Sequence, residues 1–337
     1  MRHLADPSRR DILHAAAGAG VVAAMPALAA GEPPPETKRI RLLMLKPEWN
    51  VACVAPMWIA DELLRAEGFE DVVYVPFAQA DTGIDIDVLA SGRADMTQTD
   101  IFSILPALDN GIPLVALGGI HAGCYELYGR SNLKSIRDLK GMTIAVAAGG
   151  RRAFVSAMLA YAGLDPRKDV TFIESFEGVR LLAEGKVDAT LGFAPEPQIM
   201  RERKIGVSIV NTAVDRPWSQ YFCCMATGTR DFVTRHPVAT KRALRALLKA
   251  ADICAAEPER VARALTDRGL VADYERSAQA LRDIPYKRWR EYDSADSLRF
   301  YALRLHEGGL IKSNPQKLLA QGTNWRFIEQ LKREMKA

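Results

Sequence analysis

Short runs of aliphatic and β-branched residues alternate with amphipathic stretches from Arg39 to Asn211. The runs have the length of buried strands, and the stretches between them repeat apolar residues at helical spacing. Alternation of this kind indicates an α/β fold in which parallel sheets are covered by helices. The predicted strands are Arg39–Leu45, Val72–Val75, Ala94–Thr97, Leu114–Gly118, Thr143–Ala147, Val170–Ile173, Ala189–Gly192 and Val207–Asn211. The predicted helices between them include Pro56–Glu67, Ile101–Asp109, Arg152–Ala162 and Val179–Glu184.

Two segments of the chain resemble each other. Leu89–Thr97 reads LASGRADMT, and Leu182–Thr190, which follows 93 residues later, reads LAEGKVDAT. In both, a helix is expected to stop at glycine, a basic residue follows, and aspartate leads into a strand. A period of this length is too long for a solenoid repeat and predicts one α/β unit in each of two lobes.

The last third of the chain changes character. After Asn211 the strand pattern fades apart from Tyr221–Thr227, and long helices follow. They are predicted at Val238–Ala256, Glu259–Arg268, Tyr274–Ile284 and Ser294–Glu307. We therefore expect the chain to cross into a second lobe and return. Lobe 1 would comprise residues 38–119 and 222–337, with the helical C-terminal third packed on it, and lobe 2 residues 120–221.

The first thirty residues have the pattern of an export signal. Arg9 and Arg10 precede an apolar run from Ala15 to Ala24, and Ala27-Leu28-Ala29 supplies a small-x-small cleavage site. This resembles a twin-arginine signal, which a receptor reads and which does not anchor the protein. The run is also shorter than the roughly 20 residues of a spanning helix. We expect removal of residues 1–30 near Ala29/Ala30, a periplasmic location and no direct membrane anchor.

Composition narrows the function classes. Hydrophobic residues make up 48% and charged residues 26% of the chain, an ordinary globular balance that argues against disorder. The formal net charge is only +4, which is too small an excess of positive charge to indicate nucleic-acid binding. The five cysteines show no metal-finger spacing, and no cofactor motif is present. They are Cys53, Cys124, Cys223, Cys224 and Cys254.

The cysteines allow few specific predictions. Cys223 and Cys224 are adjacent, so in a strand they would point to opposite faces and not easily share a ligand. Cys124 lies close to His121, but no second ligand pair is near in the sequence, so we expect no metal site there. An oxidising compartment would permit one disulfide, and the odd count leaves at least one thiol free. The sequence does not choose the pair.

Several motifs resemble the periplasmic solute-binding proteins for nitrate, sulfonates, taurine and related compounds. This group also includes binders of thiamine-pyrimidine precursors and the thiamine-pyrimidine synthase. The matching stretches are Gly92–Asp95, Ile136–Gly141, Gly185–Ala189, Asp296–Tyr301 and Asn324–Phe327. The resemblance implies a type II two-lobed periplasmic binding protein with two crossovers and a ligand held between the lobes. It also implies a non-enzymatic monomer that delivers a small, anionic organic solute (sulfonate, nitrate or carboxylate) to ABC permease subunits.

The ligand is expected beyond the carboxyl ends of the strands, where helix N-termini point. The segment Gly149-Gly150-Arg151-Arg152 follows a predicted strand and opens a helix. The glycines expose backbone amides, and an anion would offset the unfavourable placement of arginines at the positive end of the helix dipole. Alternatively, one arginine pairs with Glu174 or Glu177, or both extend into solvent. Family members often carry Ser or Thr here, so the ligand's identity stays open.

Other candidates follow the remaining strand ends. Trp49 and Phe193 are candidates to sandwich a planar ligand, or they belong to the core. Polar candidates are Asn50, Gln98, Thr99 and Glu196, of which Gln98 and Thr99 could instead cap a helix. Asp100 and Glu196 could likewise cap a helix or pair with a ligand amine. His121 is expected at the first crossover, near the hinge.

The sequence is also compatible with two other functions. The dipeptide Cys223-Cys224 bears a superficial likeness to the cysteine-rich stretch of the thiamine-pyrimidine synthase, so a synthase-like enzyme or a pyrimidine-precursor binder is one alternative. The export signal argues against cytosolic metabolism. A periplasmic sensor that hands its ligand to a receptor is the other.

Overall fold

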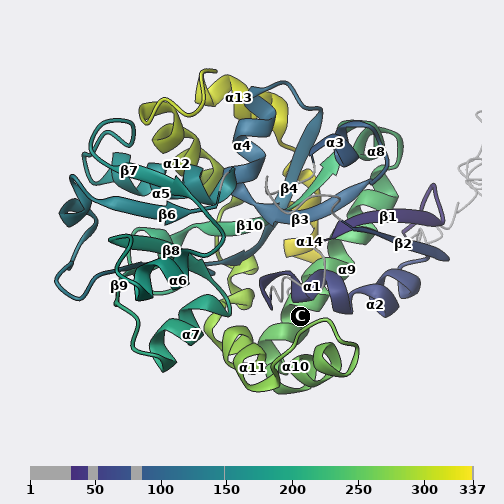
Figure 1. The fold of residues 1–337 in the computed structure, drawn as a ribbon. Helices are drawn as coiled ribbons and strands as arrows, with labels where there is room; N and C mark the ends of the chain where they lie inside the picture. Colours follow the sequence, from purple (N-terminus) through teal and green to yellow (C-terminus); the bar gives the residue numbers. More distant parts are fainter. Residues whose placement is uncertain (1–31, 45–51, 77–85, 148, 336–337) are drawn as a thin grey trace, which may run out of the picture. The chain divides into compact units, whose positions relative to one another are not determined.

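Two five-stranded sheets organise the chain (Figure 1). The computed structural model describes residues 32–44, 52–76, 86–147 and 149–335. The first sheet has the order β2-β1-β3-β10-β4 and the second the order β7-β6-β8-β5-β9. Strands of the first sheet are β1 (Arg39–Met44), β2 (Asp71–Pro76), β3 (Met96–Asp100), β4 (Leu114–Ala122) and β10 (Phe222–Thr229). Strands of the second are β5 (Tyr125–Gly129), β6 (Thr143–Val146), β7 (Thr171–Glu174), β8 (Ala189–Phe193) and β9 (Val207–Asn211).

Both sheets are mixed, so the prediction of parallel sheets is wrong in part. In the first, β1 is parallel to β2 and β3, whereas β10 is antiparallel to β3 and β4. In the second, β6 is parallel to β7 and β8, whereas β5 is antiparallel to β8 and β9. The antiparallel strands β5 and β10 are those by which the chain enters a sheet from the other one. The alternation of strands and helices along the sequence does not encode whether β5 and β10 run parallel or antiparallel. Their direction depends on which strands become their neighbours in the sheet.

The helices of the N-terminal two thirds are short. They are α1 (Ala55–Ile59), α2 (Asp61–Ala66), α3 (Ile86–Ala90), α4 (Ile101–Asp109), α5 (Gly150–Tyr161), α6 (Gly178–Ala183) and α7 (Glu196–Glu202). The C-terminal third adds α8 (Arg230–Arg235), α9 (Pro237–Ala256), α10 (Pro258–Asp267), α11 (Tyr274–Asp283), α12 (Ser294–Glu307), α13 (Pro315–Gly322) and α14 (Arg326–Glu334). Four 3-10 turns complete the described elements: η2 (Ala52–Val54), η3 (Ile136–Leu139), η4 (Trp218–Gln220) and η5 (Tyr286–Arg290).

The two matching segments do the same structural task in the two sheets. Asp95 accepts a hydrogen bond from the amide of Arg41 in β1 at 2.7 Å, and its own amide donates to the carbonyl oxygen of Arg41 at 2.8 Å. Asp188 makes the same pair of contacts with Thr143 in β6, both at 2.8 Å. Each aspartate thus fixes the start of its own strand, β3 or β8, beside the parallel strand β1 or β6. The sequence repeat is therefore a repeat of one α/β unit.

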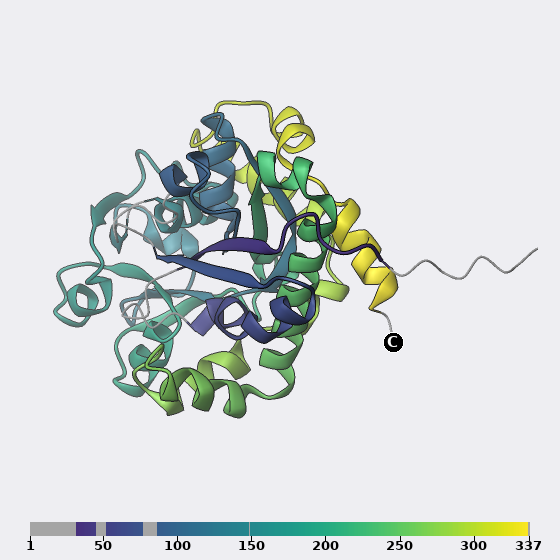
Figure 2. The same cartoon turned by 90° about the vertical axis from the view of Figure 1, so that its right-hand side faces the viewer.

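The chain passes between the sheets twice. Only Gly123 and Cys124 separate β4 from β5, and the return runs from β9 through η4 to β10. Both sheets lie in one contact unit, residues 34–337. In the C-terminal third, α9 packs on α1, α2 and β4, and α14 packs on α9 and β4. In the turned view of Figure 2, the green helices lie beside the purple and blue strands of the first sheet.

An aromatic cluster joins elements of the two halves of the fold. Phe102 of α4 stacks on Phe154 of α5 with ring centroids 3.9 Å apart, and Tyr301 of α12 meets both rings edge-on. Trp218 of η4 packs edge-on against Phe154. All four residues are buried. The C-terminal helices therefore contact the second half of the fold as well as the first.

None of the described helices has the length and apolar character needed to cross a bilayer. The predicted export signal, residues 1–30, lies outside the described residues.

Candidate functional site

The glycine–arginine segment begins α5, close to the start of α4. Gly149 is the N-cap of α5 with φ +73°, and within the described part of the chain no side chain caps this helix. A Cβ atom added to Gly150 would lie 2.4 Å from Ser103 Oγ and 2.7 Å from Asp100 Oδ1. Glycine at 150 therefore allows the N-termini of α4 and α5 to approach each other, one from each half of the fold.

Asp100 caps α4. Its Oδ1 accepts a hydrogen bond from the Ser103 amide at 2.8 Å, and its Oδ2 accepts one from Ser103 Oγ at 2.9 Å. Burial raises the pKa of Asp100, although the hydrogen bonds from Ser103 oppose this effect. Of the two uses considered for Asp100, the structure shows the capping one.

Gln98 and Thr99 lie within β3 and do not cap the following helix. Gln98 is buried, and its Nε2 donates to the carbonyl oxygen of Cys53 at 2.8 Å. Thr99 is also buried and pairs with Met225 of β10 in the sheet. Gln98 thus links β3 to η2, whereas Thr99 is placed within the first sheet beside β10.

Arg151 stands between an aromatic ring and a carboxylate. Its guanidinium carbon lies 3.6 Å from the centroid of the Phe193 ring, and its Nη1 lies 3.6 Å from Glu196 Oε2. Glu196 also accepts a hydrogen bond from the Phe193 amide at 3.0 Å. Burial raises the pKa of Glu196, and Arg151 opposes that shift. Three predicted site residues from two segments therefore meet at one point, and the Arg151 side chain is 17% exposed there.

The remaining predicted residues are distributed differently. Arg152 forms a surface ion pair with Glu174, with Nη1 and Oε1 2.7 Å apart, which is one of the alternatives weighed for this segment. Trp49 and Asn50 lie outside the described residues. His121 is buried in β4 and belongs to a separate cluster.

That cluster corrects the expectation that His121 and Cys124 have no second ligand pair. The potential ligand atoms of four buried residues lie within 4.8 Å of one another, and we call this group the thiol–imidazole cluster. It consists of Cys53, His121, Cys124 and Cys224. No local sequence pattern indicates the cluster, because its members are far apart in the chain and only Cys124 is close to His121.

Cys223 and Cys224 also depart from the expected alternation. The Sγ of Cys223 lies 3.0 Å from that of Cys124, while Cys224 belongs to the cluster and has its Sγ 3.9 Å from that of Cys223. The pairing of β10 with β4 shifts register at Cys224. Such an irregularity breaks the alternation of side chains along a strand and lets neighbouring residues reach the same region. All five cysteines carry free thiols in the structure.

The cluster forms an electrostatically unusual point in the core. Burial by itself lowers the pKa of His121, but the thiol groups of Cys224 and Cys53 outweigh this and raise it to about 10. The sulfur atoms of Cys224 and Cys53 thus lie close enough to the imidazole to interact with it electrostatically.

Comparisons with known proteins agree with the topology. A search of curated proteins gave no match. The nitrate-binding protein NrtA of Synechocystis PCC 6803 superposes with a TM-score of 0.71 at 17% identity, covering 90% of each chain. The alkanesulfonate-binding protein SsuA of Xanthomonas axonopodis pv. citri, bound to MOPS, gives 0.69 at 17% identity, covering 86% of this chain and 99% of that one. The aliphatic sulphonate-binding protein SsuA of Escherichia coli gives 0.65 at 17% identity, covering 85% and 92%.

These structures share the α/β periplasmic binding protein fold, so the predicted fold class is confirmed. A family model described as NMT1/THI5 like matches residues 71–261, more than half of the chain. The chain belongs to the NMT1/THI5-like family, and its fold is that of the periplasmic nitrate- and sulfonate-binding proteins.

Proposed function

We propose that this protein is the periplasmic substrate-binding component of an ABC importer and that it captures a small anionic organic solute. Family membership and the likeness to nitrate- and alkanesulfonate-binding proteins support the role. Those relatives are solute-binding proteins, which supports a binding role without catalysis.

The observation that carries the anionic solute is the start of α5. Gly149 and Gly150 present backbone amides at a helix N-terminus that has no side-chain cap in the described residues. Backbone amides at such a terminus, together with the helix dipole, favour an anion. Arg151 lies next in the chain and is held by Phe193 and Glu196 without being fully buried. A sulfonate or carboxylate would exchange the long 3.6 Å contact with Glu196 for a charge-assisted hydrogen bond.

Hinge closure is the proposed mechanism of capture. A solute that contacts both halves shifts an equilibrium between open and closed forms toward the closed one. In the structure α7 and α11 already contact each other across the halves. Arg276 Nη2 lies 3.0 Å from Glu202 Oε2, and Asp283 Oδ2 accepts hydrogen bonds from Arg201 Nη2 at 3.2 Å and Gln198 Nε2 at 2.9 Å. These polar contacts are suited to form and break during closure because they lie at the surface.

The remaining parts of the proposal concern location and partners. We infer export by the twin-arginine route with cleavage near Ala29, a monomeric periplasmic form, and docking of the closed form on permease subunits. The paired arginines Arg9 and Arg10 support the route. The two chain passages between the sheets support a division into two lobes, with 221/222 at the start of β10 and the first boundary at the Gly123-Cys124 connection, three residues after the expected 119/120.

A ligand screen tests the proposal. The exported protein is examined by thermal shift against sulfonates, nitrate, aromatic carboxylates and pyrimidines, and hits are confirmed by calorimetry. An anionic solute should raise the melting temperature and bind at one equivalent per chain. Binding of neutral pyrimidines alone would contradict the anionic assignment and favour a pyrimidine-precursor binder, and binding of no small molecule would contradict the proposed role.

A further inference from the structure

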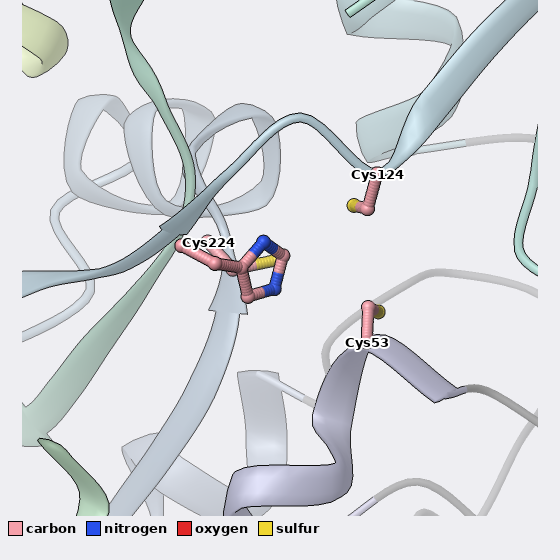
Figure 3. Close-up of side chains that lie close together, drawn as sticks. Cys53, Cys124 and Cys224 are labelled. Atoms are coloured by element: carbon pink, nitrogen blue, oxygen red, sulfur yellow. The ribbon is translucent and has the colours of Figure 1, made fainter. Parts of the chain in front are cut away.

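The thiol–imidazole cluster has no part in the proposed capture of solute. Its members come from four segments: η2 after β1, the end of β4, the two-residue connection to β5, and β10. Figure 3 shows the three labelled cysteines approaching one another from separate elements. Each member is less than a tenth exposed. The cluster therefore gathers both passages between the sheets and the segment after β1 at one buried point.

The protonation state of His121 can be read from its hydrogen bond. Its Nδ1 lies 2.9 Å from the carbonyl oxygen of Ala122, and a carbonyl oxygen only accepts, so Nδ1 carries the proton. In the neutral imidazole the lone pair is then on Nε2, which is buried and has no hydrogen-bond partner among the described residues. A histidine that ligates a metal typically donates its other ring N–H to a backbone carbonyl in this way. A buried polar atom without a partner also calls for an explanation.

The donor set fits a metal ion that prefers sulfur. Three thiols and one imidazole make a Cys₃His set, which zinc binds tetrahedrally, and thiolates also select Cu⁺. With metal–sulfur bonds of about 2.3 Å, the sulfur atoms of a tetrahedral site stand about 3.8 Å apart. The observed limit of 4.8 Å between the ligand atoms is about 1 Å wider, so small side-chain rotations would complete the site.

Neighbouring groups hold the ligands in place. Gln98 Nε2 donates to the carbonyl oxygen of Cys53 at 2.8 Å, and Tyr286 Oη donates to that of Ala52 at 3.0 Å. The Tyr286 ring also packs edge-on against His121, with centroids 5.2 Å apart. Contacts of this kind around the ligands orient them and are part of a built metal site.

Cys223 offers the competing explanation. Its Sγ lies 3.0 Å from that of Cys124, so these two residues could form a disulfide in an oxidising compartment. A disulfide there would leave Cys53, Cys224 and the free Nε2 of His121 unexplained. A metal ion accounts for all of them, and Cys223 would then donate an S–H hydrogen bond to the Cys124 thiolate.

We propose that the thiol–imidazole cluster binds one thiophilic metal ion, Zn²⁺ or Cu⁺, which ties the segment after β1 to both passages between the sheets. Binding displaces the thiol protons and involves no change of oxidation state. Since the ion would bind the folded chain and not the unfolded one, it would also stabilise the fold.

Metal titration of the exported protein tests the proposal. The protein is purified without a metal-affinity tag, reduced, stripped with a chelator, and titrated with Zn²⁺ against a chromophoric chelator. A second, anaerobic arm uses Cu⁺. We expect one ion per chain in at least one arm, and a Co²⁺ adduct with thiolate-to-cobalt charge transfer and tetrahedral d–d bands. Failure to bind either ion would overturn the proposal. No solute is involved, so this outcome leaves the proposed importer role standing.

Cysteine variants identify the ligands. Cys53→Ala and Cys224→Ala should lower the metal affinity at least about 100-fold. Cys254→Ala removes another fully buried thiol, in α9 outside the cluster, and should leave the affinity within about threefold. Cys223→Ala keeps all four ligands and should still bind. Circular dichroism and gel filtration establish that each variant is folded. Wild-type affinity in both ligand variants, or a Cys124–Cys223 disulfide whose reduction yields no metal binding, would overturn the assignment.

Discussion

The guanidinium carbon of Arg151 lies 3.6 Å from the centroid of the Phe193 ring. The two residues lie at the carboxyl ends of neighbouring parallel strands of the second sheet. Arg151 follows β6, and Phe193 is the last residue of β8. A planar guanidinium over an aromatic face is a favourable arrangement, and it leaves the edge of the guanidinium free to donate hydrogen bonds. The sequence suggested both residues separately, and the structure joins them into one unit with Glu196.

The first prediction concerns Arg151. Replacing it in Arg151→Ala should weaken binding of the anionic solute at least about tenfold, because a charge-assisted hydrogen bond is lost. Calorimetry with the best solute from the screen measures the change. The matched control is Arg152→Ala, in which the neighbouring arginine and its surface pair with Glu174 are lost. Equal losses in the two variants would mean that overall charge, and not Arg151 itself, determines affinity.

A second prediction concerns the contacts between α7 and α11. The double variant Glu202→Gln/Asp283→Asn removes the two negative charges that face Arg276 and Arg201 between α7 and α11. We expect the open form to gain population, with a larger radius of gyration without solute and about two- to tenfold weaker binding. Small-angle scattering and calorimetry give the two quantities. Glu291→Gln, which breaks a surface pair with Arg288 within one turn, serves as control and should change neither. An unchanged radius in the double variant would show that these contacts do not govern closure.

A third prediction concerns Glu67, which holds α9 to the end of α2. Its side chain is only 7% exposed, with Arg245 Nη2 at 2.5 Å and Lys249 Nζ at 3.0 Å. Burial raises the pKa of Glu67, but the hydrogen bonds from Arg245 and Lys249 outweigh it and hold the pKa below its ordinary value of 4.5. At pH 7, Glu67→Gln should lower the free energy of unfolding by about 2 kcal/mol, because the charge of a buried carboxylate that accepts hydrogen bonds from Arg245 and Lys249 is lost.

The pH dependence of that loss follows from the direction of the shift. A carboxyl whose folded-state pKa is below its unfolded value contributes stability above the unfolded pKa. This contribution disappears as the pH falls from about 4.5 through the folded-state pKa. The stability difference between wild type and Glu67→Gln, measured by urea unfolding, should therefore shrink below about pH 4.5. Glu70→Gln, at an exposed pair with Lys38, is the control and should be nearly neutral throughout.

The export prediction rests on Arg9 and Arg10. Lysine at both positions should leave the precursor in the cytoplasm, because the twin-arginine receptor reads the arginine pair. Cell fractionation with antibody detection measures the distribution. The control is Arg39→Lys, which makes the same chemical change beyond the predicted cleavage site and should not affect export. Continued export of the double-lysine precursor would rule out the assigned route.

Local signals were sufficient for most elements. The bounds of α4 (Ile101–Asp109) and α12 (Ser294–Glu307) were predicted to the residue. Both helices begin after an aspartate cap, Asp100 or Asp293, so their starts are encoded by neighbouring residues. The repeat of LASGRADMT and LAEGKVDAT likewise predicted the repeated unit, because each aspartate works within its own strand pair.

Elements with weak local patterns were missed. β5 (Tyr125–Gly129) follows β4 after two residues and is buried along its whole length. A strand buried on both faces lacks the polar alternation that would separate it from the preceding strand. The C-terminal helices α13 and α14 were indicated only by the family resemblance at Asn324–Phe327.

The sequence by itself determined the α/β class, the twofold unit, most helix ends and the candidate arginine at the start of α5, because periodicity, caps and turn residues act over a few positions. The tertiary structure alone decided the direction of β5 and β10, the partners of Arg151, and the meeting of three cysteines with His121. Those features depend on which distant segments become neighbours. That choice is made by burial of apolar surface and by strand pairing between segments far apart in the chain, which no local pattern records.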